Sequence, residues 1–109
     1  MRHSPINAPL LLLIAVATMP VHAQQPKPFD KGDPKIGQAM VDKDCHACHI
    51  RQFGYKDRIY TRQDRRVNTP AQLRAQIAFC NTQLGTSYFP EEEEHIAAYL
   101  NLHYYKFGP

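Results

Sequence analysis

The sequence predicts an all-α protein, a small domain with three main helices. Three segments start with a helix signal that contains proline: Asp33-Pro34, Thr69-Pro70, and Pro90 followed by Glu91 to Glu94. Each signal is followed by apolar residues at helical spacing. No repeat and no alternating strand pattern competes with these segments. One all-α domain is therefore expected over residues 33–109.

The first helix is expected to open at Pro34, with Asp33 as its cap. Three of its apolar residues have helical spacing: Ile36, Met40 and Val41. Gly37 inside a helix costs about 1 kcal/mol relative to alanine. It therefore predicts a close approach of another helix, with Tyr99 as the expected neighbour. Met40 is expected to lie in the core.

The middle helix is expected from Thr69-Pro70, with Leu73, Ile77 and Cys80 on one face. Cys80 therefore points toward the interior. The last helix is expected near Pro90, where the glutamates favour the positive end of the helix dipole. Its inner face is predicted to hold Ile96, Tyr99, Leu100 and His103.

The segment Cys45-His46-Ala47-Cys48-His49 has the spacing of a c-type haem attachment site. Two thiols on one helical turn can add to the two vinyl groups of one porphyrin, and His49 then reaches the iron. A Cys-x-x-Cys pair also occurs in redox dithiols and zinc sites. A redox dithiol expects βαβ surroundings, and zinc expects a second ligand pair at ordinary spacing, which the sequence lacks. His46, between the cysteines, is expected to be exposed.

The first 23 residues have the pattern of a secretory signal peptide. A short polar start precedes the apolar run from Leu10 to Met19, and Val21-His22-Ala23 predicts cleavage after Ala23. The run is shorter than the roughly 20 apolar residues that span a bilayer, so no stable membrane span is expected. Export to the bacterial periplasm suits covalent haem attachment. Residues 24–32 are polar and proline-rich, and predict a loose arm.

The formal net charge of +3 does not discriminate between functions, but the distribution of the charged residues does. Basic residues dominate the predicted loop 51–66: Arg51, Lys56, Arg58, Arg62, Arg65 and Arg66. Such a loop can neutralise haem propionates or dock an acidic redox partner. The alternative is an ordinary solvated loop. Nucleic-acid binding is not expected, because the patch is short and the protein is exported.

These elements together resemble a class I c-type cytochrome over most of the chain after residue 23. The resemblance rests on a glycine-bearing helix leading into the motif, a long loop, a middle helix and a terminal helix with Ala97-Ala98-Tyr99-Leu100. It implies a small cytochrome c fold around one covalently bound haem. The family usually takes its second iron ligand from a methionine before the terminal helix. This sequence has no methionine after Met40.

A narrower resemblance covers residues 79–90. This segment is similar to that of the small c″ and SHP cytochromes, and Cys80, Gly85 and Pro90 match their pattern. Phe79 and Tyr88 stand where that group has its ligand and its second cysteine, so neither the ligand nor the disulfide carries over. A lone inward thiol resembles instead the cytochromes with His/Cys ligation, such as the NaxLS type, which bind nitric oxide and carbon monoxide.

Cys80 is therefore the favoured second iron ligand. The alternatives are a buried free thiol and an intermolecular disulfide. Asn81 is a weaker candidate that is also placed to cap the middle helix. His95 and His103 are expected to be surface or satisfied helix residues rather than ligands.

The expected function is one-electron transfer in the periplasm by a monohaem cytochrome that is not itself an enzyme. Cys45 and Cys48 would hold the cofactor, His49 would bind the iron and Cys80 would be the second ligand. Two alternatives remain open: a protein that binds or senses nitric oxide or carbon monoxide, and a haem subunit of a larger oxidoreductase. The apoprotein is expected to be poorly folded, because the haem supplies much of the core.

Overall fold

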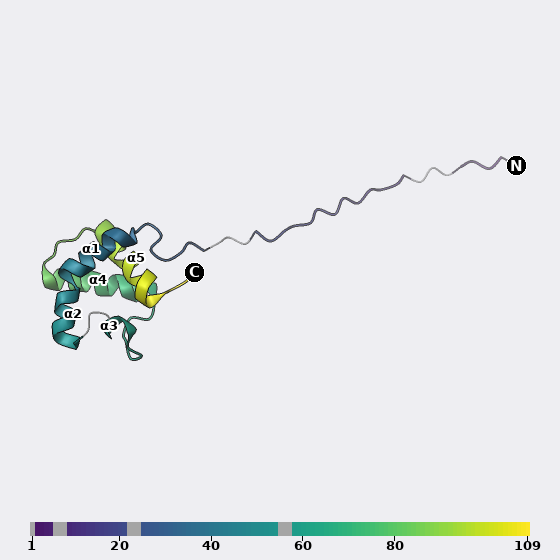
Figure 1. Cartoon of the computed structure of the whole chain (residues 1–109). Helices are drawn as coiled ribbons and strands as arrows, with labels where there is room; N and C mark the ends of the chain where they lie inside the picture. Colours follow the sequence, from purple (N-terminus) through teal and green to yellow (C-terminus); the bar gives the residue numbers. More distant parts are fainter. Residues whose placement is uncertain (1, 6–8, 22–24, 55–57) are drawn as a thin grey trace.

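The computed structural model describes residues 2–5, 9–21, 25–54 and 58–109, and these contain helices but no strand (Figure 1). The all-α prediction is confirmed. The helices are α1 (Pro34–Asp44), α2 (His46–Phe53), α3 (Arg58–Thr61), α4 (Pro70–Leu84) and α5 (Pro90–Leu100). A π-helical turn, η1 (Asn101–Tyr105), extends α5. The three predicted helices are the longest, and the structure adds α2 and α3.

The three predicted helix starts are confirmed by their hydrogen bonds. At α1, the Asp33 carboxylate accepts from the backbone N–H of Lys35 at 2.8 Å. At α4, the Thr69 hydroxyl accepts from Gln72 N–H at 3.2 Å. At α5, the Glu92 side chain reaches back and accepts from Phe89 N–H at 2.8 Å. Each bond satisfies a backbone donor that has no partner inside its own helix.

Helices α1 and α5 pack backbone to backbone, and two glycines make this possible. A Cβ atom on Gly37 would collide with the backbone carbonyl of His95 and lie 3.0 Å from Ile96 N. A Cβ on Gly32 would lie 2.8 Å from the Ala98 Cβ. The close approach predicted for Gly37 is confirmed, but its neighbour is the α5 backbone rather than the Tyr99 ring.

The core extends further toward the N-terminus than the sequence predicts. Phe29 lies within the predicted arm 24–32, yet its side chain is only 3% exposed. The Arg74 guanidinium stacks 4.6 Å from the centre of the Phe29 ring and pairs with the Glu94 carboxylate at 2.5 Å. The loose-arm prediction is therefore wrong for Phe29 and Gly32, which contact the helices, whereas Asp30 and Lys31 are exposed.

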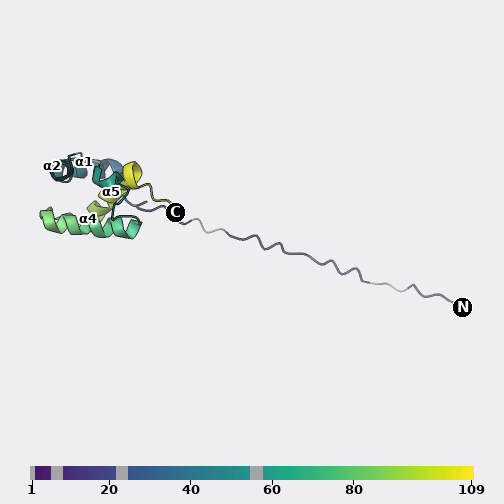
Figure 2. The same cartoon turned by 90° about the horizontal axis from the view of Figure 1, so that it is seen from below.

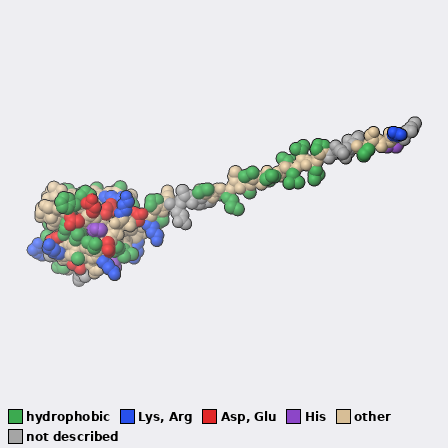
Figure 3. All heavy atoms as spheres, turned by 90° about the horizontal axis from the view of Figure 1, so that it is seen from above, with side chains coloured by type: hydrophobic (Ala, Val, Ile, Leu, Met, Phe, Trp, Pro, Cys, Tyr) green, Lys and Arg blue, Asp and Glu red, His purple; other side chains and the backbone are tan. Residues whose placement is uncertain are grey.

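The described residues before Phe29 lead away from the helical domain (Figure 1). The longest dimension of the structure is 107 Å, against 30 and 20 Å for the other two. The apolar side chains of residues 10–16 project into solvent along it (Figure 3). The predicted cleavage point after Ala23 lies outside the described residues. Within the described part of the chain, no helix has the length and apolar character needed to cross a membrane.

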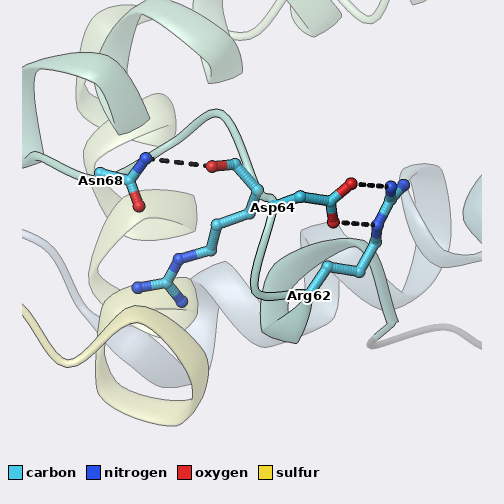
Figure 4. Close-up of polar contacts among 4 residues, drawn as sticks. Arg62, Asp64 and Asn68 are labelled. Atoms are coloured by element: carbon cyan, nitrogen blue, oxygen red, sulfur yellow. Dashed lines mark hydrogen bonds and ion pairs between the residues drawn. The ribbon is translucent and has the colours of Figure 1, made fainter.

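The predicted basic loop 51–66 is partly helical. Arg51 lies in α2 and Arg58 opens α3, whereas Lys56 lies outside the described residues. After α3, Arg62 and Asp64 form a two-point ion pair at 2.6 and 2.9 Å (Figure 4). Because both side chains are exposed, this pair shapes the turn but contributes little to stability. The Asn68 amide then donates to the backbone carbonyl of Arg65 at 3.0 Å.

The helices form two layers (Figure 2). Helices α1 and α2 lie in one layer, and α4 runs in the other. Helix α5 contacts both α1 and α4 and so joins the layers. Its residues Ile96 to Leu100 are all buried, whereas His103 is exposed. His103 therefore does not belong to the buried face that the sequence assigned to it.

Candidate functional site

A cavity of about 610 Å³ lies between the two layers. Cys45, Cys48 and His49 line it from the α1–α2 junction, and Cys80 lines it from α4. Its volume falls within the roughly 300–1,000 Å³ of small-molecule and cofactor pockets. The structure thus brings all four predicted site residues to one cavity, although Cys80 is separated from the motif by more than thirty positions in the sequence.

The two motif cysteines stand at the junction of α1 and α2. Cys45 ends α1, where its N–H donates to the Val41 carbonyl at 3.0 Å, and its own carbonyl accepts from His49 N–H at 3.2 Å. Cys48 lies one turn later, and its sulfur accepts from the Arg51 guanidinium at 3.2 Å. Because one helical turn separates them, both thiols reach the same cavity.

Burial raises the pKa of the Cys45 thiol to about 11, with smaller contributions from Cys80, Asp44 and Cys48. Cys45 and Cys80 line the same cavity from different helices. All three cysteines are free thiols in the structure. The Cys45 thiol is therefore protonated at neutral pH, and only its deprotonated form is a strong nucleophile.

The His49 ring is held by Tyr60 of α3. The Tyr60 hydroxyl and His49 Nδ1 are 2.9 Å apart, and the two rings meet edge to face at 5.2 Å. Burial, and then the neighbouring His46, lower the pKa of His49. Both effects favour the neutral imidazole, which is the form that binds a metal ion.

Cys80 occupies the α4 wall as its helical register predicts. Leu73 and Ile77 on the same face are buried, and Cys80 is half-buried where it meets the cavity. The Gln76 amide donates to its sulfur at 3.3 Å. Its predicted inward direction is confirmed.

His46 is buried, so the prediction that it is exposed is wrong. Its residue surface is only 4% exposed, and Nδ1 pairs with the Asp42 carboxylate at 2.9 Å. Its ring lies 6.1 Å from the Tyr60 ring, and Nε2 has no hydrogen-bond partner among the described residues. The chain changes direction between α1 and α2, and this turns His46 toward α3. A five-residue motif does not reveal that change of direction.

Asn81 has a structural role in the turn between α4 and α5. Its amide nitrogen donates to the Tyr88 carbonyl at 2.9 Å and to the Glu93 carboxylate at 2.7 Å. Its amide oxygen accepts from the Thr86 hydroxyl at 2.6 Å and from Tyr88 N–H at 3.0 Å. The Tyr88 hydroxyl in turn donates to the Asp44 carboxylate across the cavity mouth. Asn81 lines the cavity, but these four bonds occupy its amide.

The remaining ligand candidates lie elsewhere. His95 Nδ1 accepts from Asp33 N–H at 2.8 Å, which fits the expected satisfied helix residue. His103 is exposed, and its ring contacts that of Tyr99 at a tilt, with 4.7 Å between ring centres. Met40 packs against the core, as expected. None of the three lines the cavity.

Both charged and apolar side chains border the cavity. Arg62, Arg65 and Arg66 line it from the segment after α3. Arg65 donates to the Tyr60 carbonyl at 3.0 Å and lies 4.9 Å from the centre of the Tyr105 ring. Phe79 lines the cavity from α4, but 59% of its surface remains exposed.

No three His, Cys, Asp or Glu side chains come together as a metal-binding cluster within the described residues. Comparisons with protein-family models, curated proteins and solved structures found no match to this chain. The residues that surround the cavity are therefore the features that indicate a function.

Tyr60 is the site residue that the sequence analysis missed. It is 4% exposed, contacts His49 and lines the same cavity. The available signal was Ile59-Tyr60, an apolar pair between Arg58 and Thr61-Arg62. Such a pair in a charged segment is typical of an anchor to the core.

Proposed function

We propose that this chain holds one covalently attached haem and transfers single electrons. Cys45 and Cys48 would form the two thioether links, and His49 would bind the iron. The observation that carries the proposal is the placement of both thiols and the imidazole on one wall of a single 610 Å³ cavity. A bound haem supplies a one-electron iron couple, and the protein supplies attachment, ligands and electrostatics.

The residues around the cavity fit this group. The Cys-x-x-Cys-His spacing is that of haem attachment, and the cavity gives its thiols a common space. A haem iron takes its equatorial ligands from the porphyrin, so the protein needs to provide only one or two more. The half-buried His49, whose lowered pKa favours the neutral imidazole, suits that role. The helix order α1, motif, α4 and α5 supports the proposed class I cytochrome c fold.

Cys80 is the proposed second iron ligand. It lines the cavity from α4, in the layer across from the helix that carries His49 (Figure 2). Asn81 is held by four hydrogen bonds, and His95, His103 and Met40 lie away from the cavity. Metal coordination deprotonates a thiol, and a thiolate favours ferric iron. We therefore expect a reduction potential lower than that of a haem whose second ligand is methionine.

Electron transfer is the preferred function because charged residues flank the cavity. Arg62, Arg65 and Arg66 line it together with Asp64, which pairs with Arg62, so Arg65 and Arg66 are the residues that can neutralise propionates or steer an acidic redox partner. A pocket for nitric oxide or carbon monoxide would be closed by apolar side chains, whereas Phe79 is largely exposed.

The proposed compartment is the periplasm, since the exposed apolar run from Leu10 to Met19 suits a signal peptide.

Acid-acetone extraction of the matured protein tests the attachment. Haem should remain with the wild-type polypeptide, because two thioethers survive denaturation. Cys45→Ala and Cys48→Ala should each retain at most one link, and the double variant should release all of its haem. Cys80→Ala is the matched control and should retain both links. Complete extraction from the wild-type protein would rule out the proposal.

Cys80→Ser tests the second ligand. The wild-type ferric protein should have a low-spin thiolate spectrum, in absorption and in electron paramagnetic resonance. The variant should become high-spin or take another ligand, and its reduction potential should rise because an anionic donor is lost. Unchanged spectrum and potential in Cys80→Ser would eliminate Cys80 as a ligand.

Carbon monoxide binding to the same two proteins separates the carrier from the gas-binding alternative. A carrier that retains Cys80 in the ferrous state should bind carbon monoxide slowly, since the ligand must leave first. The Cys80→Ser variant should bind it faster. Rapid, complete binding by the wild-type ferrous protein would favour the gas-binding function and leave the haem attachment intact.

A further inference from the structure

The orientation of His49 depends on more than its helix. The ring is attached through a rotatable side chain near the middle of the eight-residue helix α2. An imidazole needs a second contact to hold one ring orientation and one tautomer. In this structure Tyr60 provides such a contact, with 2.9 Å between its hydroxyl oxygen and His49 Nδ1.

Tyr60 is itself firmly placed. Its ring stacks on Tyr104 at 4.8 Å and meets the edge of Tyr105 at 6.0 Å. Its backbone carbonyl accepts from Arg65 at 3.0 Å. With 4% of its surface exposed, Tyr60 has little room to change rotamer. Its hydroxyl therefore has a defined position relative to His49.

The chemistry of a metal-bound histidine gives each of its two ring nitrogens a different role. One ring nitrogen binds the metal, and the other donates its N–H to an acceptor outside the coordination sphere. Because Tyr60 lies at Nδ1, Nε2 is the nitrogen for the iron. The Tyr60 oxygen then accepts from Nδ1–H, which makes the imidazole a stronger electron donor.

We infer that Tyr60 is the positioning residue for His49, fixing its ring orientation and its Nε2 ligation through the hydroxyl. This inference rests on the proposed haem attachment. It adds a determinant of the reduction potential that lies outside the Cys-x-x-Cys-His motif. The hydroxyl accounts for this effect, whereas the ring accounts for the packing of α3 on η1.

Tyr60→Phe in the haem-loaded protein separates these two roles, since it removes the hydroxyl and keeps the ring. The reduction potential should rise, because a less basic imidazole stabilises ferric iron less. The electron paramagnetic resonance lines of the ferric form should broaden as the ring orientation becomes less uniform. Tyr104→Phe, which removes a hydroxyl from the ring that stacks on Tyr60 and is not part of the cavity lining, is the matched control and should leave both properties near wild type.

If Tyr60→Phe does not fold, nuclear magnetic resonance of the wild-type holoprotein tests the same hydrogen bond. His49 Nδ1–H should give a resonance that exchanges with water much more slowly than the ring protons of exposed His103. Exchange as fast as that of His103, or equal potentials in Tyr60→Phe and Tyr104→Phe, would overturn the inference. Those results would leave covalent attachment unaffected, whereas haem lost in acid acetone would instead refute the proposed function.

Discussion

Phe29→Ala is expected to lower the free energy of unfolding by about 3–5 kcal/mol, the usual cost of removing a buried phenylalanine. The ring is 3% exposed and carries the Arg74 guanidinium on its face. Its backbone φ of 62° is in the left-handed region, which a bulky residue adopts only where the surrounding structure compensates. The side chain of Phe29 therefore holds the start of the domain against the core.

Urea unfolding of the purified holoprotein measures this effect. Phe89→Ala is the matched control, because Phe89 is 70% exposed and its bond to Glu92 uses the backbone. The control should stay within about 0.5 kcal/mol of wild type, as is usual for surface substitutions. Equal stabilities of the two variants would show that the segment before α1 is not part of the cooperative fold.

Gly37→Ala is expected to destabilise the protein although alanine favours helices. Helix propensity alone would stabilise the variant by about 1 kcal/mol. The new methyl group, however, would collide with the His95 carbonyl, and a backbone carbonyl cannot turn aside as a flexible side chain can. Overpacking of this kind typically costs 1–3 kcal/mol and occasionally more. Because α1 and α5 must move apart, we expect a net loss of up to about 2 kcal/mol after the gain in helix propensity is subtracted.

Thermal unfolding measures this loss, with roughly 4–8 °C in Tm for each kcal/mol in a domain of this size. Gly108→Ala is the control, since a Cβ there meets no atom within 4 Å and its φ is not positive. A Gly37→Ala protein that melts with the control would contradict the backbone contact between α1 and α5.

The sequence predicted those features that short segments determine. Asp33, Thr69 and Pro90 mark helix starts because capping bonds reach only two or three residues along the chain. The inward face of Cys80 follows from helical spacing in the same way. The motif residues could be predicted for the same reason, since Cys45, Cys48 and His49 lie within one short segment.

Features that depend on distant contacts were not predicted. Phe29 lies in a polar, proline-rich segment, and its burial depends on α4 and α5. The burial of His46 depends on the angle between α1 and α2 and on Tyr60. Tyr99 was wrongly predicted as the neighbour of Gly37, because a glycine within a helix indicates that another helix approaches closely but not which atoms of that helix make the contact.

The contact of α1 with α5 also joins segments that lie far apart along the chain. A chain that is made from its N-terminus completes Gly32 and Gly37 well before residues 94–98, which these two glycines meet. During that interval the start of the domain has no α5 backbone to pack against. Docking of α5 ends the interval, because the His95 carbonyl then closes over Gly37 and the Glu94 carbonyl over Gly32. The order of the helices along the chain thus makes the contact between α1 and α5 a late step in the assembly of the domain.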